Sequence, residues 1–177
     1  NYALLTHADG SVDVVMPDDG LQRFIKQADG SYLASNPSSV ALTRVTDTAG
    51  KVSWTFLDAD NSQYRFADNG QFIQLINPNG LSQRLTYNAK GLLATVSDDF
   101  GHQFTLSYSD DGLFLTSIVS NSGAQVSYTY DEVGNLKLVT RKPLRVPAAG
   151  ERRDGVWAQW RWLFFLAVAV ITGCTAT

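Results

Sequence analysis

The sequence is poor in the residues that build disulfides and metal centres. Its 177 residues include one cysteine, Cys174, and two histidines, His7 and His102. A disulfide framework is therefore excluded, and a zinc centre of the usual Cys/His kind lacks its ligands. Neither histidine has a Cys or Ser nucleophile at a persuasive spacing. We interpret both histidines as solvated or turn-capping residues rather than as a base or a metal ligand.

Charge is also scarce. Charged residues make up 18% of the chain, the net charge is -3 and the pI is near 5.2. A general nucleic-acid binder would show a basic face, so this class is disfavoured. The chain has no G-x-x-x-x-G-K-[ST] run, which leaves nucleotide binding without support, and we predict no cofactor. Hydrophobic residues reach 44%, which is enough for a folded core and argues against a disordered chain.

The charge that is present divides the chain. Residues 1–140 carry 8 Lys/Arg against 15 Asp/Glu, whereas residues 141–177 carry 6 against 2. Two prolines and three cations in residues 141–147 interrupt any strand or helix pattern. We therefore predict a repeat segment over 1–140, a Pro/Arg-rich linker over 141–156 and an apolar tail over 157–177.

Turn residues recur at nearly equal spacing through the first segment. Many of the glycines follow Asp or Asn, a pair that supplies the positive φ of tight hairpin turns. Two of the expected turn positions, residues 36–39 and 58–61, lack glycine but contain other turn-forming residues. The glycines lie at positions 10, 20, 30, 50, 70, 80, 91, 101, 112, 123 and 134.

Apolar and polar residues alternate between these turns. Val52, Trp54 and Phe56 alternate with Ser53 and Thr55, and the same pattern recurs near residues 81–87, 104–108 and 126–130. Alternation with period two is typical of a strand with one buried face. We expect an all-β fold of consecutive antiparallel hairpins stacked into a long twisted sheet, followed by an apolar tail that could be helical.

Pairing successive hairpins gives a longer period. An aromatic residue followed four positions later by glycine occurs at Phe66, Tyr87, Tyr108 and Tyr130, at steps of 21, 21 and 22 residues. A constant period of this size indicates a repeat array, in which each hairpin is marginal alone and gains stability from its neighbours.

The last copy also resembles a known family. The run from Tyr128 to Thr140, YTYDEVGNLKLVT, is similar to the Tyr-Asp (YD) repeat of RHS proteins, whose usual form is Y-x-Y-D-x-x-G-x-L-x-x-V. Earlier copies have Asn88 or Ser109 in place of the aspartate. The positions that carry the motif are Tyr87, Gly91, Tyr108, Gly112, Tyr128, Tyr130, Asp131, Gly134 and Leu136.

This resemblance implies a hollow shell of antiparallel sheet in a large secreted or surface protein of bacteria, where the shell encloses a toxic domain. The chain is short for such a protein and lacks the family's D-P-x-G-type release motif. We therefore expect a fragment of the shell, whose partners are the remaining repeats and the toxin cargo. The expected function is structural and not catalytic.

Two other functions were weighed against this one. Paired carboxylates at Asp18-Asp19, Asp98-Asp99 and Asp110-Asp111 could bind calcium or act as acid and base, but turn chemistry explains them more simply. Exposed aromatic residues could stack on sugars, which makes a carbohydrate- or cell-surface-binding module the alternative function. We favour packing for the tyrosines because they lie on the alternating apolar face.

The tail has three interpretations. Its charge-free stretch runs for 16 residues, from Trp162 to Thr177, which is short of the roughly 20 that a helix needs to cross a bilayer. Basic residues, an apolar run and Cys174 resemble a lipoprotein signal at the wrong end of the chain. A displaced or frameshifted tail is the first interpretation, a membrane anchor the second, and a buried strand or helix the third.

Overall fold

The structure is a computed structural model, which describes residues 2–17, 20–36 and 39–142. The predicted linker from residue 143 onward, the tail over 157–177 and the pair Asp18-Asp19 lie outside these ranges. Within them, no helix is long and apolar enough to span a membrane.

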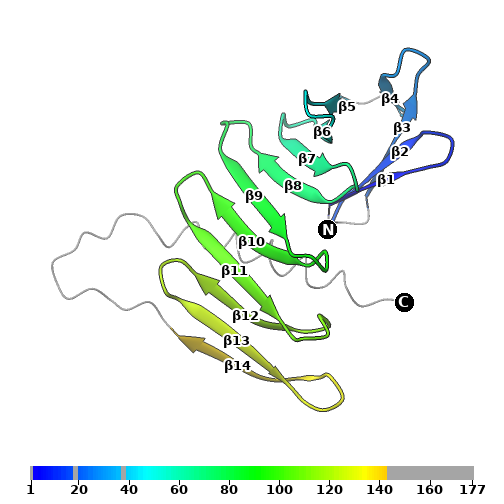
Figure 1. The fold of residues 1–177 in the computed structure, drawn as a ribbon. Helices are drawn as coiled ribbons and strands as arrows, with labels where there is room; N and C mark the ends of the chain where they lie inside the picture. The colour runs from blue at the N-terminus through cyan, green and yellow to red at the C-terminus, as the bar shows by residue number, and fades with distance from the viewer. Residues whose placement is uncertain (1, 18–19, 37–38, 143–177) are drawn as a thin grey trace. The chain divides into compact units, whose positions relative to one another are not determined.

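The described part of the chain is built of β-strands joined by short turns, so the all-β prediction is confirmed (Figure 1). Within each sheet of the described part of the chain, consecutive strands pair with each other, and the pairs are antiparallel. The strands are β1 (Ala3–Thr6), β2 (Val12–Val15), β3 (Leu21–Lys26), β4 (Tyr32–Ala34), β5 (Ala41–Thr46), β6 (Val52–Leu57), β7 (Gln63–Ala67), β8 (Phe72–Ile76), β9 (Ser82–Tyr87), β10 (Leu93–Asp98), β11 (Gln103–Tyr108), β12 (Leu115–Ser120), β13 (Gln125–Tyr130) and β14 (Leu136–Lys142).

These strands form two sheets. Strands β1–β4 make a four-stranded sheet, and β5–β14 make a ten-stranded sheet in sequence order. The change of sheet falls between Ala34 and Ala41, at one of the two turn positions that lack glycine. At the other, Asn61 takes a φ of 67°, and the turn joins two paired antiparallel strands. Asparagine tolerates this left-handed conformation better than most residues, so it replaces glycine there.

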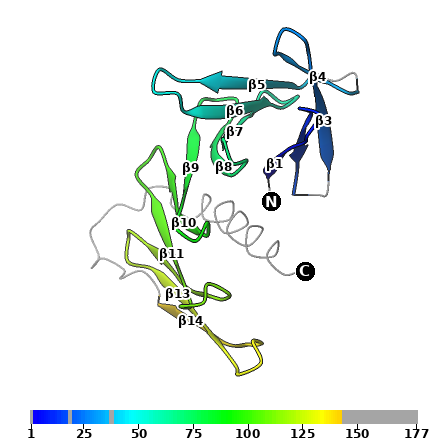
Figure 2. The same cartoon turned by 45° about the vertical axis from the view of Figure 1, so that its right-hand side comes forward.

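Residues 1–85 form one compact unit, in which the two sheets meet over an aromatic core. Phe24 of the small sheet contacts Phe56 of the large one with ring centroids 6.0 Å apart, and Tyr32 meets Trp54 edge-on at 5.1 Å. Figure 2 shows the strands of the small sheet beside β5 and β6. Phe24, Phe56 and Phe66 are almost completely buried. Their alternation with polar residues therefore reflects one face turned toward the partner sheet.

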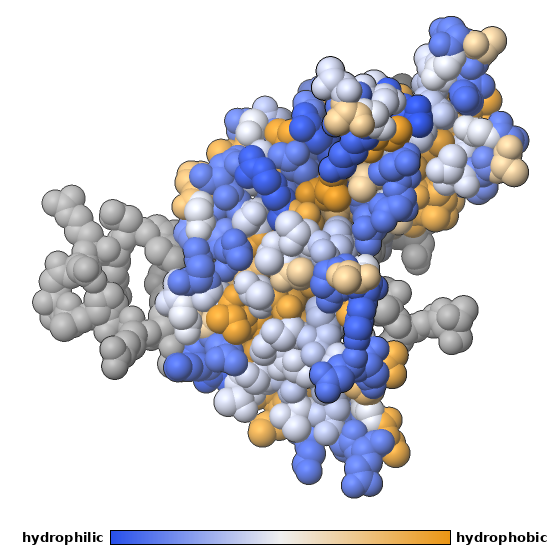
Figure 3. All heavy atoms as spheres, viewed as in Figure 1, coloured by the Kyte–Doolittle hydropathy of each residue, from blue (hydrophilic) through white to orange (hydrophobic). Residues whose placement is uncertain are grey.

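From Thr86 onward the described strands form a second unit with a single layer. One face carries apolar side chains, where Leu106 pairs across the strands with Ile118, and Ile118 with Val126. The other face carries a row of hydroxyl side chains in direct register, Ser107, Ser117, Ser127 and Thr140. Figure 3 shows hydrophobic and intermediate residues over the strands, with the most hydrophilic residues gathered near the turns.

Candidate functional site

The repeat tyrosines tie neighbouring hairpins together. The Tyr108 hydroxyl donates to the carbonyl oxygen of Leu93 at 3.0 Å, and the Tyr130 hydroxyl donates to the carbonyl oxygen of Leu115 at 2.9 Å. Both bonds reach back 15 residues, so the same clamp occurs in two successive repeats. Each phenol packs its ring on the apolar face and satisfies its polar end on backbone, as a half-buried tyrosine requires.

The residue after the tyrosine caps the turn. The Oδ1 atom of Asp131 accepts hydrogen bonds from the backbone N–H groups of Val133 and Asn135, at 3.1 and 2.8 Å. Asn88 makes the equivalent pair of bonds to Lys90 and Leu92. These two backbone bonds need a single side-chain oxygen, so asparagine can replace aspartate at this position. This explains why the motif tolerates Asn88. Asp131 adds one bond that asparagine lacks, because its Oδ2 accepts from Asn135 Nδ2 at 3.1 Å.

Ser109 marks a longer turn. In the ordinary turns the first residue donates its N–H to the carbonyl four residues on, as from Asp131 to Asn135 at 2.9 Å, whereas Ser109 donates to Phe114, five residues on. The capping is shared between two residues: Asp111 Oδ1 accepts from Leu113 N–H at 3.0 Å, and Ser109 Oγ accepts from Phe114 N–H at 3.0 Å. The extra residue accounts for the 22-residue step between Tyr108 and Tyr130.

The motif glycines lie against the preceding motif turn. A Cβ atom on Gly134 would fall 2.9 Å from Cζ of Phe114, and one on Gly112 would fall 3.1 Å from Cδ1 of Leu92. At the opposite margin, a Cβ on Gly101 or Gly123 would meet nothing within 4 Å. All four glycines have positive φ. The glycines of one margin are therefore closely stacked, whereas those of the other have free space beside them, although Asn121 Nδ2 donates there to the carbonyl oxygen of Gly101 at 2.7 Å. The full motif recurs at the stacked margin, which is every second turn.

The remaining motif positions lie on β9, β13 and β14 and in the turn after β9. Gly91 also has a positive φ, of 76°. Burial, with a smaller effect from Tyr108, raises the pKa of Tyr87 to about 12. Burial likewise raises the pKa of Tyr128, which pairs across the sheet with Val139. Leu136 pairs with Tyr130 and is 54% exposed on β14, the last strand of the sheet.

β14 extends slightly beyond the predicted repeat segment. It ends at Lys142, with Arg141 paired to Val126 and Lys142 paired to Gln125. The charge pattern of the sequence predicts both cations in the linker. Their strand pairing is a backbone property that the charge pattern does not reveal.

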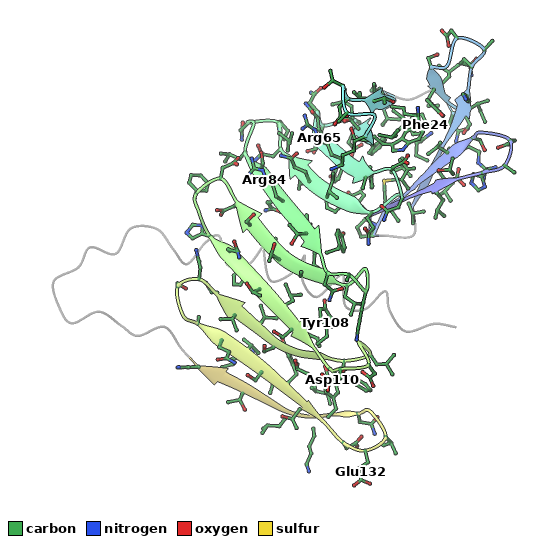
Figure 4. All side chains as sticks on the ribbon, viewed as in Figure 1. Phe24, Arg65, Arg84, Tyr108, Asp110 and Glu132 are labelled. Carbon is green, nitrogen blue, oxygen red and sulfur yellow. The ribbon has the colours of Figure 1, made fainter. Side chains whose placement is uncertain are left out.

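Two of the acidic pairs take part in turns. Oδ1 of Asp98 accepts from the N–H groups of Phe100 and His102, while its Oδ2 lies 2.8 Å from Nδ1 of His102. The carbonyl oxygen of Asp110 accepts a hydrogen bond from the Lys90 ammonium. Asp110 and Glu132 project from turns of the stacked margin (Figure 4). In the described ranges, no three His, Cys, Asp or Glu side chains are grouped to hold a metal ion.

One polar cluster was missed by the sequence analysis. Asp13 is 2% exposed, although it lies on the β2 face that points away from the aromatic core. Arg23 donates to both of its oxygens at 2.7 Å, and Nε2 of His7 lies 2.7 Å from Oδ2. The Arg23 hydrogen bonds, aided by His7, lower the pKa of Asp13 to about 2. A carboxylate inside the run Val12-Asp13-Val14 was the available signal, but its partners come from β3 and from the residue that follows β1.

The described residues define a class of protein. It is built of stacked antiparallel hairpins, and tyrosine hydroxyls join neighbouring hairpins along one margin of the sheet. A family model described as RHS Repeat matches residues 108–144. No curated protein matches the chain. The match covers about a fifth of the chain, and together with the antiparallel hairpin fold it fits a fragment of an RHS/YD-repeat protein. Repeats of this family are generally structural, and they imply that the chain is part of a longer repeat protein.

Proposed function

We propose that this chain is a non-catalytic wall segment of an RHS-repeat shell, which encloses or presents another domain in a secreted or cell-surface bacterial protein. The observation that carries the proposal is the difference between the two faces of the sheet from β10 to β14. Leu106, Leu115 and Ile118 on one face are 5–6% exposed, while the other face bears the hydroxyl row. A single layer with one apolar and one polar face separates two environments.

The clamped margin supports the same role. The hydroxyl bonds of Tyr108 and Tyr130 and the contact between the Phe114 and Tyr130 rings, 4.7 Å between centroids, join each hairpin to the one before it. Stability in such an array comes from nearest-neighbour contacts, so the wall can be extended by further repeats. The toxin cargo belongs to this proposal as the expected content of the shell.

The repeat tyrosines give the carbohydrate-binding alternative little support. Tyr108 and Tyr130 are half-buried, and their hydroxyls are bonded to backbone carbonyls. A sugar platform needs an open ring face and a free polar edge, which these residues do not combine.

Cysteine accessibility tests the wall. Thr105→Cys on the exposed polar face and Leu106→Cys on the apolar face are neighbours in β11, and each is made with Cys174→Ser in the longest reading frame that contains the chain. We expect rapid maleimide labelling of Thr105→Cys and slow labelling of Leu106→Cys in the folded protein, and equal labelling after unfolding. Equal rates in the folded protein would contradict an enclosed face.

A further inference from the structure

Two Asn-Gly pairs stand at the same position of two neighbouring turns. Asn69-Gly70 lies in the turn between β7 and β8, and Asn79-Gly80 lies in the turn between β8 and β9 (Figure 1). Both glycines have positive φ, and each donates its N–H to the carbonyl oxygen three residues before it, at 2.9 Å. An asparagine followed by glycine is chemically labile, because glycine has no Cβ to hinder attack by its backbone nitrogen on the asparagine side chain. The two turns therefore place the same labile pair in two different surroundings.

The side chain of Asn69 and the backbone of Gly70 are both held in place. Oδ1 of Asn69 accepts from the N–H group of Gln71 at 3.1 Å, and its Nδ2 donates to Oε1 of Gln71 at 2.9 Å. Gly70 is buried, and its carbonyl oxygen accepts from the N–H group of Leu4 at 3.1 Å. A bridge between Ala3 and Gln71 adds a second link to β1. A movement of this turn therefore has to break contacts with β1.

The side chain of Asn79, in contrast, is left out of the capping of its own turn. The turn also contains Asn77, whose Oδ1 accepts from the N–H groups of Asn79 and Leu81, both at 3.0 Å. Asn77 thereby occupies the N–H group that the third residue caps in the neighbouring turn. Among the described residues, the side-chain amide of Asn79 has no hydrogen-bond partner. Gly80 is exposed, and an added Cβ would meet nothing within 4 Å.

From this contrast we propose that Asn79 is a site of spontaneous deamidation in the folded protein, whereas Asn69 is protected. The backbone nitrogen of Gly80 attacks Cγ of Asn79, the Cγ–Nδ2 bond breaks, and ammonia leaves with the proton that the attacking nitrogen has lost. Water then opens the resulting cyclic imide and gives either aspartate or isoaspartate. The attack requires the hydrogen bond from Gly80 to Asn77 to open, which costs less in a turn without other contacts.

The aspartate product fits the turn. Asp9 and Asp29 occupy the equivalent position of their own turns, where Oδ1 accepts from the N–H group two residues on, at 2.9 Å. Isoaspartate instead continues the chain through its side-chain carbon, which lengthens the backbone of the turn. Deamidation therefore adds a negative charge at this turn without an enzyme, and one of its two products keeps the hairpin intact. The site does not depend on the proposed wall function.

The two asparagines can be compared in one sample. The full chain is incubated at neutral pH in water enriched in heavy oxygen, which marks every newly hydrolysed imide, and the peptides that contain each asparagine are quantified by mass spectrometry. We expect Asn79 to react roughly tenfold faster than Asn69, or more, in the folded protein, since only the Asn69 turn must break contacts with β1. In guanidinium chloride the two rates should agree within about threefold, because the turns are then lost.

Two variants test the role of the competing cap. Asn77→Ala gives this turn the same first, third and fourth residues as the turn of Asn69. Oδ1 of Asn79 can then accept from the N–H group of Leu81, and the rate at Asn79 should fall by about threefold or more. Asn88→Ala removes the same kind of cap from the turn after β9, which contains no Asn-Gly pair, and should leave the rate at Asn79 unchanged. Circular dichroism verifies that both variants fold.

The proposal is overturned if Asn69 reacts as fast as Asn79 in the folded protein, or if Asn79 reacts in guanidinium chloride but not in the folded chain. It is also overturned if Asn77→Ala leaves the rate at Asn79 unchanged or raises it. A variant Asn88→Ala that slows Asn79 as much as Asn77→Ala does would contradict the role of the local cap.

Discussion

The first 85 residues and the strands that follow them use the same hairpin but bury their apolar faces differently. In the first unit the small sheet packs on β5–β8, and the large side chains that the structure describes with less than 2% exposure, Phe24, Phe56, Phe66, Val12 and Val14, belong to it. In the second, neighbouring hairpins are held by tyrosine clamps and stacked turns along one margin. A repeat can therefore be stabilised either by a second layer or by its own margin.

The strongest test of this difference is removal of an aromatic ring from the two-layered core. Phe24→Ala should lower the free energy of unfolding by about 3–5 kcal/mol, because it removes a fully buried ring and leaves a cavity. Ile25→Ala, one residue away on the opposite face and 42% exposed, should cost less than about 1 kcal/mol. Urea unfolding followed by circular dichroism measures both, and equal losses would mean that the aromatic contacts are not a core.

A second test compares the two margins of the sheet. Gly134→Ala combines a φ of 88° with a contact of 2.9 Å to the Phe114 ring, and we expect a loss of about 2–3 kcal/mol. Gly123→Ala has a similar φ of 91° but open space, so it should cost only about 1–2 kcal/mol. Thermal or urea unfolding of the two variants gives the difference. A larger loss for Gly123→Ala would contradict the clamped margin.

Acid should weaken the first unit through Asp13. Its pKa is lowered from 3.8 to about 2, so the ionised form stabilises the fold above pH 3.8, and this contribution disappears as the pH falls toward 2. We expect about 1–2 kcal/mol, after allowance for solvent around the exposed Arg23 and His7.

The Asp13→Asn variant isolates this effect. Its unfolding free energy should fall less than that of the unchanged chain between pH 5 and 2, when both are measured by urea unfolding. Parallel pH profiles would show that Asp13 is not the group responsible.

The smallest effect is expected from the tyrosine clamp itself. Tyr130→Phe keeps the ring against Phe114 but removes the hydroxyl that donates to Leu115, and it should cost about 1 kcal/mol. Amide hydrogen exchange near Leu115 should rise in this variant. Tyr32→Phe, in the first unit, is the comparison, and it should leave exchange at Leu115 unchanged.

Much of the fold could be predicted from the sequence because turns are local. Asp or Asn before glycine indicates where the chain reverses, and the alternation between Val52 and Phe56 indicates which side chains share a face. The change of sheet between Ala34 and Ala41 was not predictable in this way. Its residues are turn formers like those at 58–61, and the outcome depends on packing between Phe24 and Phe56, which are far apart in the sequence.

The candidate site was predicted only in part for the same reason. The recurrence of Tyr108 and Tyr130 marks the motif, but their acceptors are backbone carbonyls, which every residue has, so no side chain identifies Leu93 or Leu115. The cluster around Asp13 is also not predictable from the sequence, because its partners His7 and Arg23 are brought to it by the pairing of β1, β2 and β3. Sequence patterns therefore predict contacts that recur in each repeat, but they do not predict a contact that occurs only once.

The open margin has a consequence for how such proteins change over time. At Gly80, Gly101 and Gly123, added atoms meet nothing within 4 Å, and the tyrosine clamps lie at the other ends of the strands. Loops of varied length could therefore be inserted beside these glycines without disturbing the register of the hairpins, provided that the hydrogen bond from Asn121 to Gly101 is kept. In related proteins we expect the turns at this margin to vary in length, while the turns at the margin with the tyrosine clamps keep their spacing in the sequence.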